Sequence, residues 1–137
     1  MTRADLVRKK LAEIETFVSE LRALGHPANL AEDLVQRRFV EHTLQIAIQA
    51  VLDVASHIVS DDRLGEPSNN GELMELLARH GWIEKGLGDA LRQAAGFRNL
   101  VVHGYADVDL AILRQVAEVG VEDLLKFATQ VRSRLPE

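Results

Sequence analysis

Several features that define common classes of protein are missing from this sequence. Its 137 residues include no cysteine, which excludes disulfides, thiolate zinc sites and cysteine nucleophiles. The longest unbroken apolar run is the four residues from Leu110 to Leu113, far below the roughly 20 that cross a bilayer. The N-terminus lacks the basic, apolar and small-residue order of a signal peptide. We therefore expect a cytoplasmic protein without membrane contact.

An excess of positive charge is also missing. The 16 basic and 21 acidic residues give a net charge of −5, so the chain as a whole should be repelled by polyphosphate. Any action on RNA or DNA would need a local basic site. The length fits a single domain spanning 1–137, and a hydrophobic content of 47% can supply its core.

The apolar residues recur every three or four positions, and no alternating stretch between turn residues predicts a strand. The fold class is therefore expected to be all-α, an up-down bundle of four to five helices. Asn29 is the expected cap of the second helix, and Asp107 or Asp109 of the last. The predicted helices span about 4–24, 30–60, 72–80 and 84–103, with a last one towards the C-terminus.

The second predicted helix carries two apolar lines. The second line, Ile48, Leu52, Ala55 and Val59, broadens the apolar surface, as expected of a central helix that touches several neighbours or a partner chain. We expect it to be the dimer helix. Its polar stripe is either a solvated face or the lining of a cleft, for which Gln45, Gln49 and Asp53 are the candidates; the whole stripe comprises Arg38, His42, Gln45, Gln49, Asp53 and His57.

Several site types are excluded by spacing. None of the five histidines is paired with another at four residues or preceded by Glu at three, so helical metal motifs are absent. No glycine-rich loop ends in Gly-Lys-Ser/Thr, and no serine occupies a Gly-x-Ser-x-Gly context. We expect neither a metal nor a cofactor.

Chemistry is concentrated in residues 97–105. Asn99 and His103 are four residues apart, so on a helix the amide can hydrogen-bond the imidazole and fix its tautomer. A histidine can exchange a proton near neutral pH, and the guanidinium of Arg98 can grip a phosphate. Arg98 and His103 lie about 140° apart on an ideal helix, so a distorted turn, the reach of Arg98 or a second subunit must bring them together.

The same residues also have a purely structural interpretation. Arg98 would pair with a surface acid, His103 would cap the end of a helix, and Tyr105 would fill the edge of the core. Spacing alone does not distinguish this interpretation from a ribonuclease site.

The segment resembles the signature of the HEPN superfamily, and specifically of the HepT-like toxins. Their motif is Arg, a polar residue, three further residues, His, any residue and Tyr, which Arg98, Asn99, His103 and Tyr105 match. The long second helix and the loop and short helix before Trp82 extend the resemblance over essentially the whole chain.

The resemblance implies a homodimeric, metal-independent endoribonuclease toxin paired with an MNT-type nucleotidyltransferase antitoxin. Arg98 and His103 would carry catalysis on RNA in a cleft shared by two subunits, and Asn99 would support them. Tyr105 would be the residue to which the antitoxin transfers AMP, which silences the toxin by charge and bulk. Two alternatives remain open, namely a catalytically silent scaffold for a nucleotidyltransferase and a module that binds free nucleotide.

Overall fold

The chain is described from a computed structural model that covers residues 3–103 and 109–136, with residues 102 and 103 described by their backbone alone. No strand occurs in these ranges, which confirms the all-α fold. A short 3₁₀ turn, η1, precedes α2, and a π-helical turn, η2, joins α5 to α6. The elements are α1 (Ala4–Leu24), η1 (Pro27–Asn29), α2 (Leu34–Asp61), α3 (Asn70–Arg79), α4 (Lys85–His103), α5 (Leu110–Gln115), η2 (Val116–Gly120) and α6 (Val121–Arg134).

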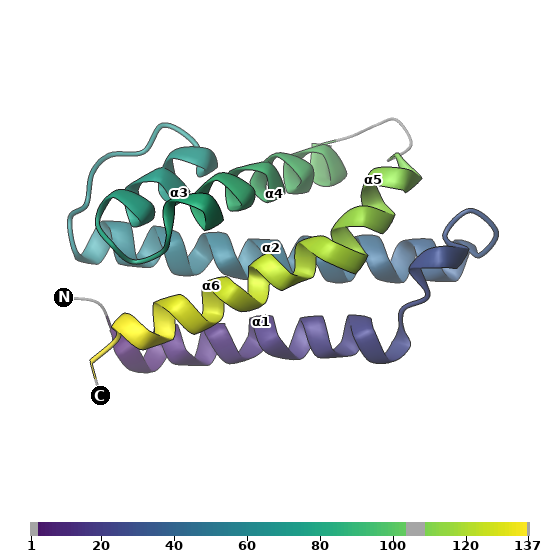
Figure 1. Ribbon diagram of the computed structural model, residues 1–137, viewed down its shortest axis with the longest axis horizontal. Helices are drawn as coiled ribbons and strands as arrows, with labels where there is room; N and C mark the ends of the chain where they lie inside the picture. Colours follow the sequence, from purple (N-terminus) through teal and green to yellow (C-terminus); the bar gives the residue numbers. More distant parts are fainter. Residues whose placement is uncertain (1–2, 104–108, 137) are drawn as a thin grey trace.

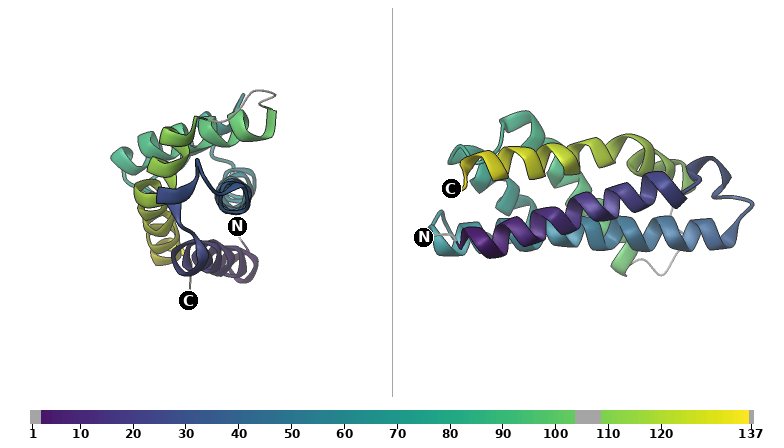
Figure 2. Two further views of the ribbon diagram at one scale, coloured as in Figure 1. Left: turned by 90° about the vertical axis from the view of Figure 1, so that its right-hand side faces the viewer. Right: turned by 90° about the horizontal axis from the view of Figure 1, so that it is seen from below.

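The helices pack side by side as an up-down bundle (Figure 1). Seen along the bundle, α1, α2, α4 and the α5–η2–α6 rod surround a common centre, and α3 lies beside α4 (Figure 2). The helix α2 packs against α1, α3, α4 and α6. It is therefore the central helix that its two apolar lines predicted.

The core consists of the positions at which the apolar periodicity pointed inward. On α1 the apolar residues at three- and four-residue steps are all buried, namely Val7, Leu11, Ile14, Val18 and Leu21. On α2 the second line is buried, and so is the first, which comprises Val40, Leu44, Ala47, Val51, Val54 and Ile58. Phe127, Leu113 and Leu124 fill the centre from the last helices. The predicted inward faces are thus confirmed.

The burial of the second line on α2 shows that neighbours in the same chain, and not a partner chain, cover that line. Ile48, Leu52, Ala55 and Val59 are at most 3% exposed within a single chain, so these residues cannot form a dimer surface. Because α3 and α4 pack on α2, neighbours in the same chain cover this surface. By length and hydropathy α2 could cross a membrane, but 61% of its most apolar window is buried in the bundle.

The start of α2 differs from the prediction. Asn29 lies in η1 and is not the cap; the cap is Asp33, whose Oδ1 accepts from the backbone N–H of Gln36 at 3.1 Å. The reason is that Gln36 ties the α1–α2 connection together, donating to the carbonyl of Leu24 at 3.1 Å and accepting from the N–H of His26 at 2.7 Å. These bonds fix the connection and delay the helix start by one turn.

The last predicted helix is interrupted by the π-helical turn. Asp109 caps α5 by accepting from the N–H of Ala111 at 2.8 Å, as predicted, whereas Asp107 lies outside the described residues. The α6 end is held to α1 by a two-bond ion pair, in which Arg132 donates to both carboxylate oxygens of Glu15 at 2.6 and 3.1 Å. Hydrogen bonding and charge from Arg132 lower the pKa of Glu15 below its ordinary value.

Candidate active site

The helix α4 carries the described part of the Arg-x4-His motif. It continues without a break to His103 despite Gly86, Gly88 and Gly96, so Asn99 and His103 are four residues apart on one helix, as expected. The close approach of α3 explains Gly88, because an added Cβ would lie 3.2 Å from the Cβ of Ala78. Space does not explain Gly96, since a Cβ there would meet nothing within 4 Å.

Arg98 is half-buried, and one of its N–H groups donates no hydrogen bond to the described residues. Its Nη1 donates to Oδ1 of the exposed Asn99 at 3.2 Å, whereas its Nε is buried without a hydrogen-bond partner among the described residues. No acidic side chain in the described ranges forms an ion pair with Arg98, so the purely structural role of Arg98 is not supported there. A buried N–H without a partner costs about 1–3 kcal/mol.

The other two motif residues are located less completely. His103 is the last residue of α4, and its side chain is not among those described. Tyr105 lies outside the described residues; in the sequence it stands between His103 and the α5 cap Asp109.

The candidate cleft residues of α2 form a polar line on its outer surface. Gln45 and Gln49 are half-buried and Asp53 is exposed. Gln49 Nε2 donates to Asp53 Oδ1 at 2.8 Å, while Gln49 Oε1 is buried without a partner in the described part of the chain. Further along this stripe, His57 Nε2 lies 3.0 Å from Asp61 Oδ2, although the two atoms are not aligned for a hydrogen bond.

Helix geometry places this polar line on the same side of the molecule as the motif. Ile48 of α2 and Phe97 of α4 line one cavity, so the two helices approach each other at the level of these positions. On α2, Val51 of the first apolar line lies on one side of Ile48. Gln49 lies on the other side, about 100° from Ile48 around the helix. On α4, Asn99 lies about 160° from Phe97, beyond the side that faces α2. Both sets therefore border the outer face of the α2–α4 pair.

By this geometry the half-buried guanidinium of Arg98 and the amide groups of Gln45 and Gln49 border one face of the α2–α4 pair, called the outer α2–α4 face. Asp53 lies further from the end of α4 at His103, because α2 and α4 run in opposite directions (Figure 1). Buried polar groups in folded proteins almost always have partners, so two that lack them, Gln49 Oε1 and Arg98 Nε, call for an explanation. A polar ligand or a partner chain on this face would supply one.

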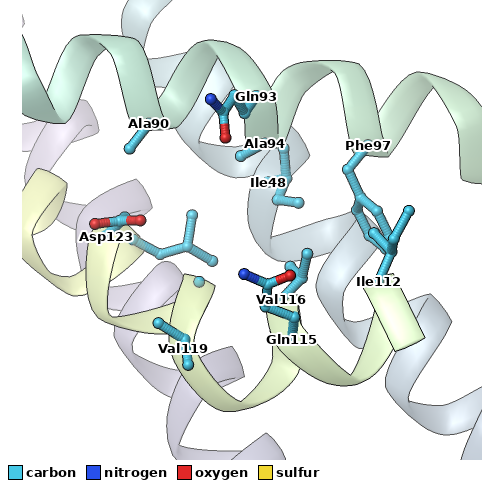
Figure 3. A pocket seen from close by; sticks show the side chains of 12 residues that line it. Ile48, Ala90, Gln93, Ala94, Phe97, Ile112, Gln115, Val116, Val119 and Asp123 are labelled. Carbon is cyan, nitrogen blue, oxygen red and sulfur yellow. The ribbon is translucent and has the colours of Figure 1, made fainter. Parts of the chain in front are cut away.

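Possible metal ligands and a cavity beside α4 are the other features of this region. Within the described ranges, no group of three or more His, Asp or Glu side chains gathers in a way that could hold a metal ion. A cavity of about 240 Å³ opens on the opposite flank of α4, between that helix and the α5–η2–α6 rod (Figure 3). Sequence reasoning did not find this cavity, because its lining comes from three separate segments.

Comparison with known proteins assigns the chain to a family. The model of the family described as HepT-like ribonucleases matches residues 7–131. The chain belongs to this family. It is therefore a ribonuclease-type helical protein, and the expected membership of the HepT-like family is confirmed over residues 7–131.

Two characterised relatives are nucleases by name. The chain is 28% identical over 130 residues to the mRNA nuclease HepT of Shewanella oneidensis, covering 94% of this chain and 98% of the relative. It is 26% identical over 134 residues to the tRNA nuclease HepT of Aphanizomenon flos-aquae, covering 98% and 88%.

Solved structures of similar proteins have the same fold as this chain. A tri-AMPylated HEPN toxin of Shewanella oneidensis in complex with an MNT antitoxin superposes with a TM-score of 0.86 at 27% identity, covering 95% of this chain and 98% of that one. A cytosolic protein of unknown function from Bacillus subtilis gives a TM-score of 0.86 at 16% identity, covering 96% and 90%, which shows the shared fold.

Proposed function

We propose that this HepT-like ribonuclease is the toxin of a toxin–antitoxin pair and cleaves RNA without a metal ion, with residues 1–137 acting as one domain in the cytoplasm. The observation that carries the proposal is the unpartnered, buried Nε of Arg98 on the helix that ends at His103. A guanidinium with a free N–H in this position is suited to a phosphate, which it can bind through two parallel hydrogen bonds.

The reaction uses the 2′-hydroxyl of the RNA as nucleophile. The 2′-oxygen attacks the adjacent phosphorus, and the bond between phosphorus and the 5′-oxygen breaks. The 2′-hydroxyl loses its proton to a base, and the leaving 5′-oxygen gains a proton from an acid. His103 takes the first proton or supplies the second, and Arg98 stabilises the charge that builds on the phosphate oxygens. Asn99, which accepts a hydrogen bond from Arg98, holds the guanidinium in place.

A homodimer completes the cleft. Arg98 and His103 point about 140° apart on one helix, so two copies that meet on the outer α2–α4 face can combine the arginine of one with the histidine of the other. Gln45, Gln49 and Asp53 then line this shared cleft, and the buried Gln49 Oε1 gains a partner across it.

Control by AMPylation at Tyr105 is the second part of the proposal. The tyrosine oxygen attacks the α-phosphorus of ATP on an MNT-type nucleotidyltransferase, pyrophosphate leaves, and the phenolic proton passes to a base of that enzyme. The added group carries negative charge, which repels RNA beside the cleft. The related Shewanella oneidensis toxin is tri-AMPylated in its complex with an MNT antitoxin, which supports this part.

The deciding experiment compares wild type with His103→Ala and Arg98→Ala for cleavage of a labelled RNA in EDTA. We expect cleavage by wild type and a loss of about 100-fold or more in each variant, the range for removal of a general base or of a charge-stabilising group. The protein is first checked by mass spectrometry, because an AMPylated sample would also be inactive. Unmodified wild type that leaves RNA intact would refute the ribonuclease proposal.

Two other functions remain testable in the same preparation. A scaffold for a nucleotidyltransferase would assemble with its partner equally well with His103→Ala and would show no activity of its own. A nucleotide-binding module would release or take up heat with a free nucleotide in calorimetry and leave RNA uncut. Tyr105→Phe should cleave RNA and escape silencing by the transferase; full silencing of this variant would exclude Tyr105 as the control point.

A further inference from the structure

The flank of α4 that faces away from the motif carries an exposed apolar groove. Leu100, Ile112 and Val119 are 64%, 45% and 62% exposed, and the last two line the cavity of about 240 Å³ beside α4. Gln93, Gln115 and Asp123 place polar groups around it (Figure 3). Leu100 does not line the cavity but stands one turn beyond the lining residue Phe97 on α4. The five lining residues together with Leu100 at their margin are called the apolar groove below. An apolar centre with a polar rim is the usual composition of a protein-binding surface.

The fold keeps this groove open. In η2 the chain makes a π-helical turn, a form that is rare and often occurs at functional sites. Val119 stands out from this turn while Val116 packs against the core. Exposed apolar side chains that gather on one surface, instead of lying scattered, mark a site of interaction.

The groove is poorly suited to RNA and to the dimer partner. Its one charged residue, Asp123, is negative and would repel phosphate. Phe97 and Gln93, which line the cavity, lie about 80–160° around α4 from His103 and Asn99, whereas Leu100, at the margin of the groove, lies about 60° from His103 and 100° from Asn99. A second copy that completes the cleft must approach the other flank, so the groove is left free in the proposed dimer.

The position of the groove along the chain indicates what covers it. Leu100 lies one turn before the end of α4, and Ile112 lies in the first turn of α5. The segment between these helices contains Tyr105, the proposed acceptor of AMP. An enzyme that modifies Tyr105 has to dock beside the ends of α4 and α5, where the groove lies.

We propose that the apolar groove is the docking surface for the nucleotidyltransferase that silences this chain, an inference that rests on the proposed function. An apolar side chain of the transferase enters the cavity between α4 and η2, and a basic or N–H donor group lies opposite Asp123. Docking on this flank leaves the Arg98–His103 cleft facing the dimer partner, so the transferase reaches Tyr105 without opening the dimer.

The test uses Val119→Asp and Ile112→Glu, which bring charge into the groove at exposed positions where the fold should tolerate it. Leu6→Glu is the matched control, since Leu6 is 40% exposed in the first turn of α1. The N-terminal end of α1 lies at the opposite end of the bundle from α5 (Figure 1). The probe is the purified MNT-type transferase from the same genome that silences wild type. Affinity is measured by calorimetry, AMP transfer by mass spectrometry, assembly by light scattering, and RNA cleavage with unmodified protein.

We expect both groove variants to lose affinity for the transferase by about tenfold or more and to be AMPylated more slowly, while RNA cleavage and dimer size match wild type and Leu6→Glu. Unchanged affinity in both groove variants would overturn the inference. So would conversion to monomers, which would make the groove a dimer surface, or weaker RNA cleavage by intact dimers, which would make it an RNA surface. Wild type that neither cleaves RNA nor accepts AMP would instead refute the proposed function.

Discussion

The three glycines of α4 allow a sharp test of how this helix is held. Replacing Gly96 with alanine adds a Cβ that meets nothing within 4 Å. Alanine is better than glycine inside a helix by about 0.8–1 kcal/mol, so Gly96→Ala should raise the free energy of unfolding by up to about 1 kcal/mol and Tm by about 3 °C. Gly86→Ala also meets open space but lies in the first turn of α4, so its gain should be smaller.

Gly88→Ala should behave in the opposite way. Its Cβ would lie 3.2 Å from the Cβ of Ala78 and 3.4 Å from the carbonyl oxygen of Met74, which is backbone and yields little. Overpacking a tight contact costs about 1–3 kcal/mol, which offsets or exceeds the gain in helix propensity. We therefore expect a net change between neutral and about 2 kcal/mol less stable.

The assay is urea unfolding followed by circular dichroism, with all variants at one protein concentration so that dimerisation affects them equally. The slopes of the unfolding free energy against urea concentration should match among wild type and the three variants, so that the midpoints report stability. If Gly88→Ala stabilises the protein as much as Gly96→Ala does, the packing argument for α3 against α4 is wrong. If Gly96→Ala is destabilising, the open space around this position is filled by the partner chain that the proposed dimer brings to the side of α4 bearing Asn99 and His103.

Three further predictions follow from single contacts. Asp33→Ala should lower the unfolding free energy by about 1 kcal/mol in urea, whereas Asn29→Ala should change it little, and equal losses would contradict the assigned cap. Because Arg132 lowers the pKa of Glu15, their pair stabilises the fold above the ordinary pKa of a glutamate and loses this effect as the pH falls through the lowered value. Glu15→Gln should therefore lower Tm slightly at pH 7, and by much less than loss of a buried pair would, because both side chains are partly exposed. At strongly acidic pH the substitution should no longer lower Tm. An equal decrease in Tm at both pH values would exclude the ion pair as its cause. Phe127→Ala should cost about 3–5 kcal/mol because the ring is fully buried, and a loss below about 1 kcal/mol in thermal unfolding would contradict this placement.

Much of the bundle could be predicted from periodicity. The lines on α1 and α2 were assigned to the core because apolar residues at three- and four-residue steps share one face of a helix, and all of them are buried. The boundaries were less accurate at α2, because Gln36 makes contacts to residues 10 and 12 positions earlier that no local cap rule contains. The π-helical turn at Val116–Gly120 was not predicted, because the apolar periodicity of the last helix continues through it.

For the candidate site, sequence gave the motif residues and their order but not their surroundings. Arg98 and Asn99 were singled out from spacing and family resemblance, yet the bond between them and the buried, unpartnered Nε are properties of the packed helix pair. Gln49 follows Ile48 in the sequence, but only the fold shows that Ile48 lines the same cavity as Phe97 of α4. The level at which Gln49 lies beside α4 could therefore not be read from the sequence.

The sequence by itself determined the all-helical class, the inward face of each long helix and the family, because these depend on local periodicity and on a short motif within one helix. Tertiary structure decided which surfaces remain for partners. The second apolar line of α2 is closed by α3 and α4, while the groove of Leu100, Ile112 and Val119 stays open. The physical reason is that an apolar side chain looks the same in the sequence whether its own chain or another one covers it, and packing between distant helices makes that choice.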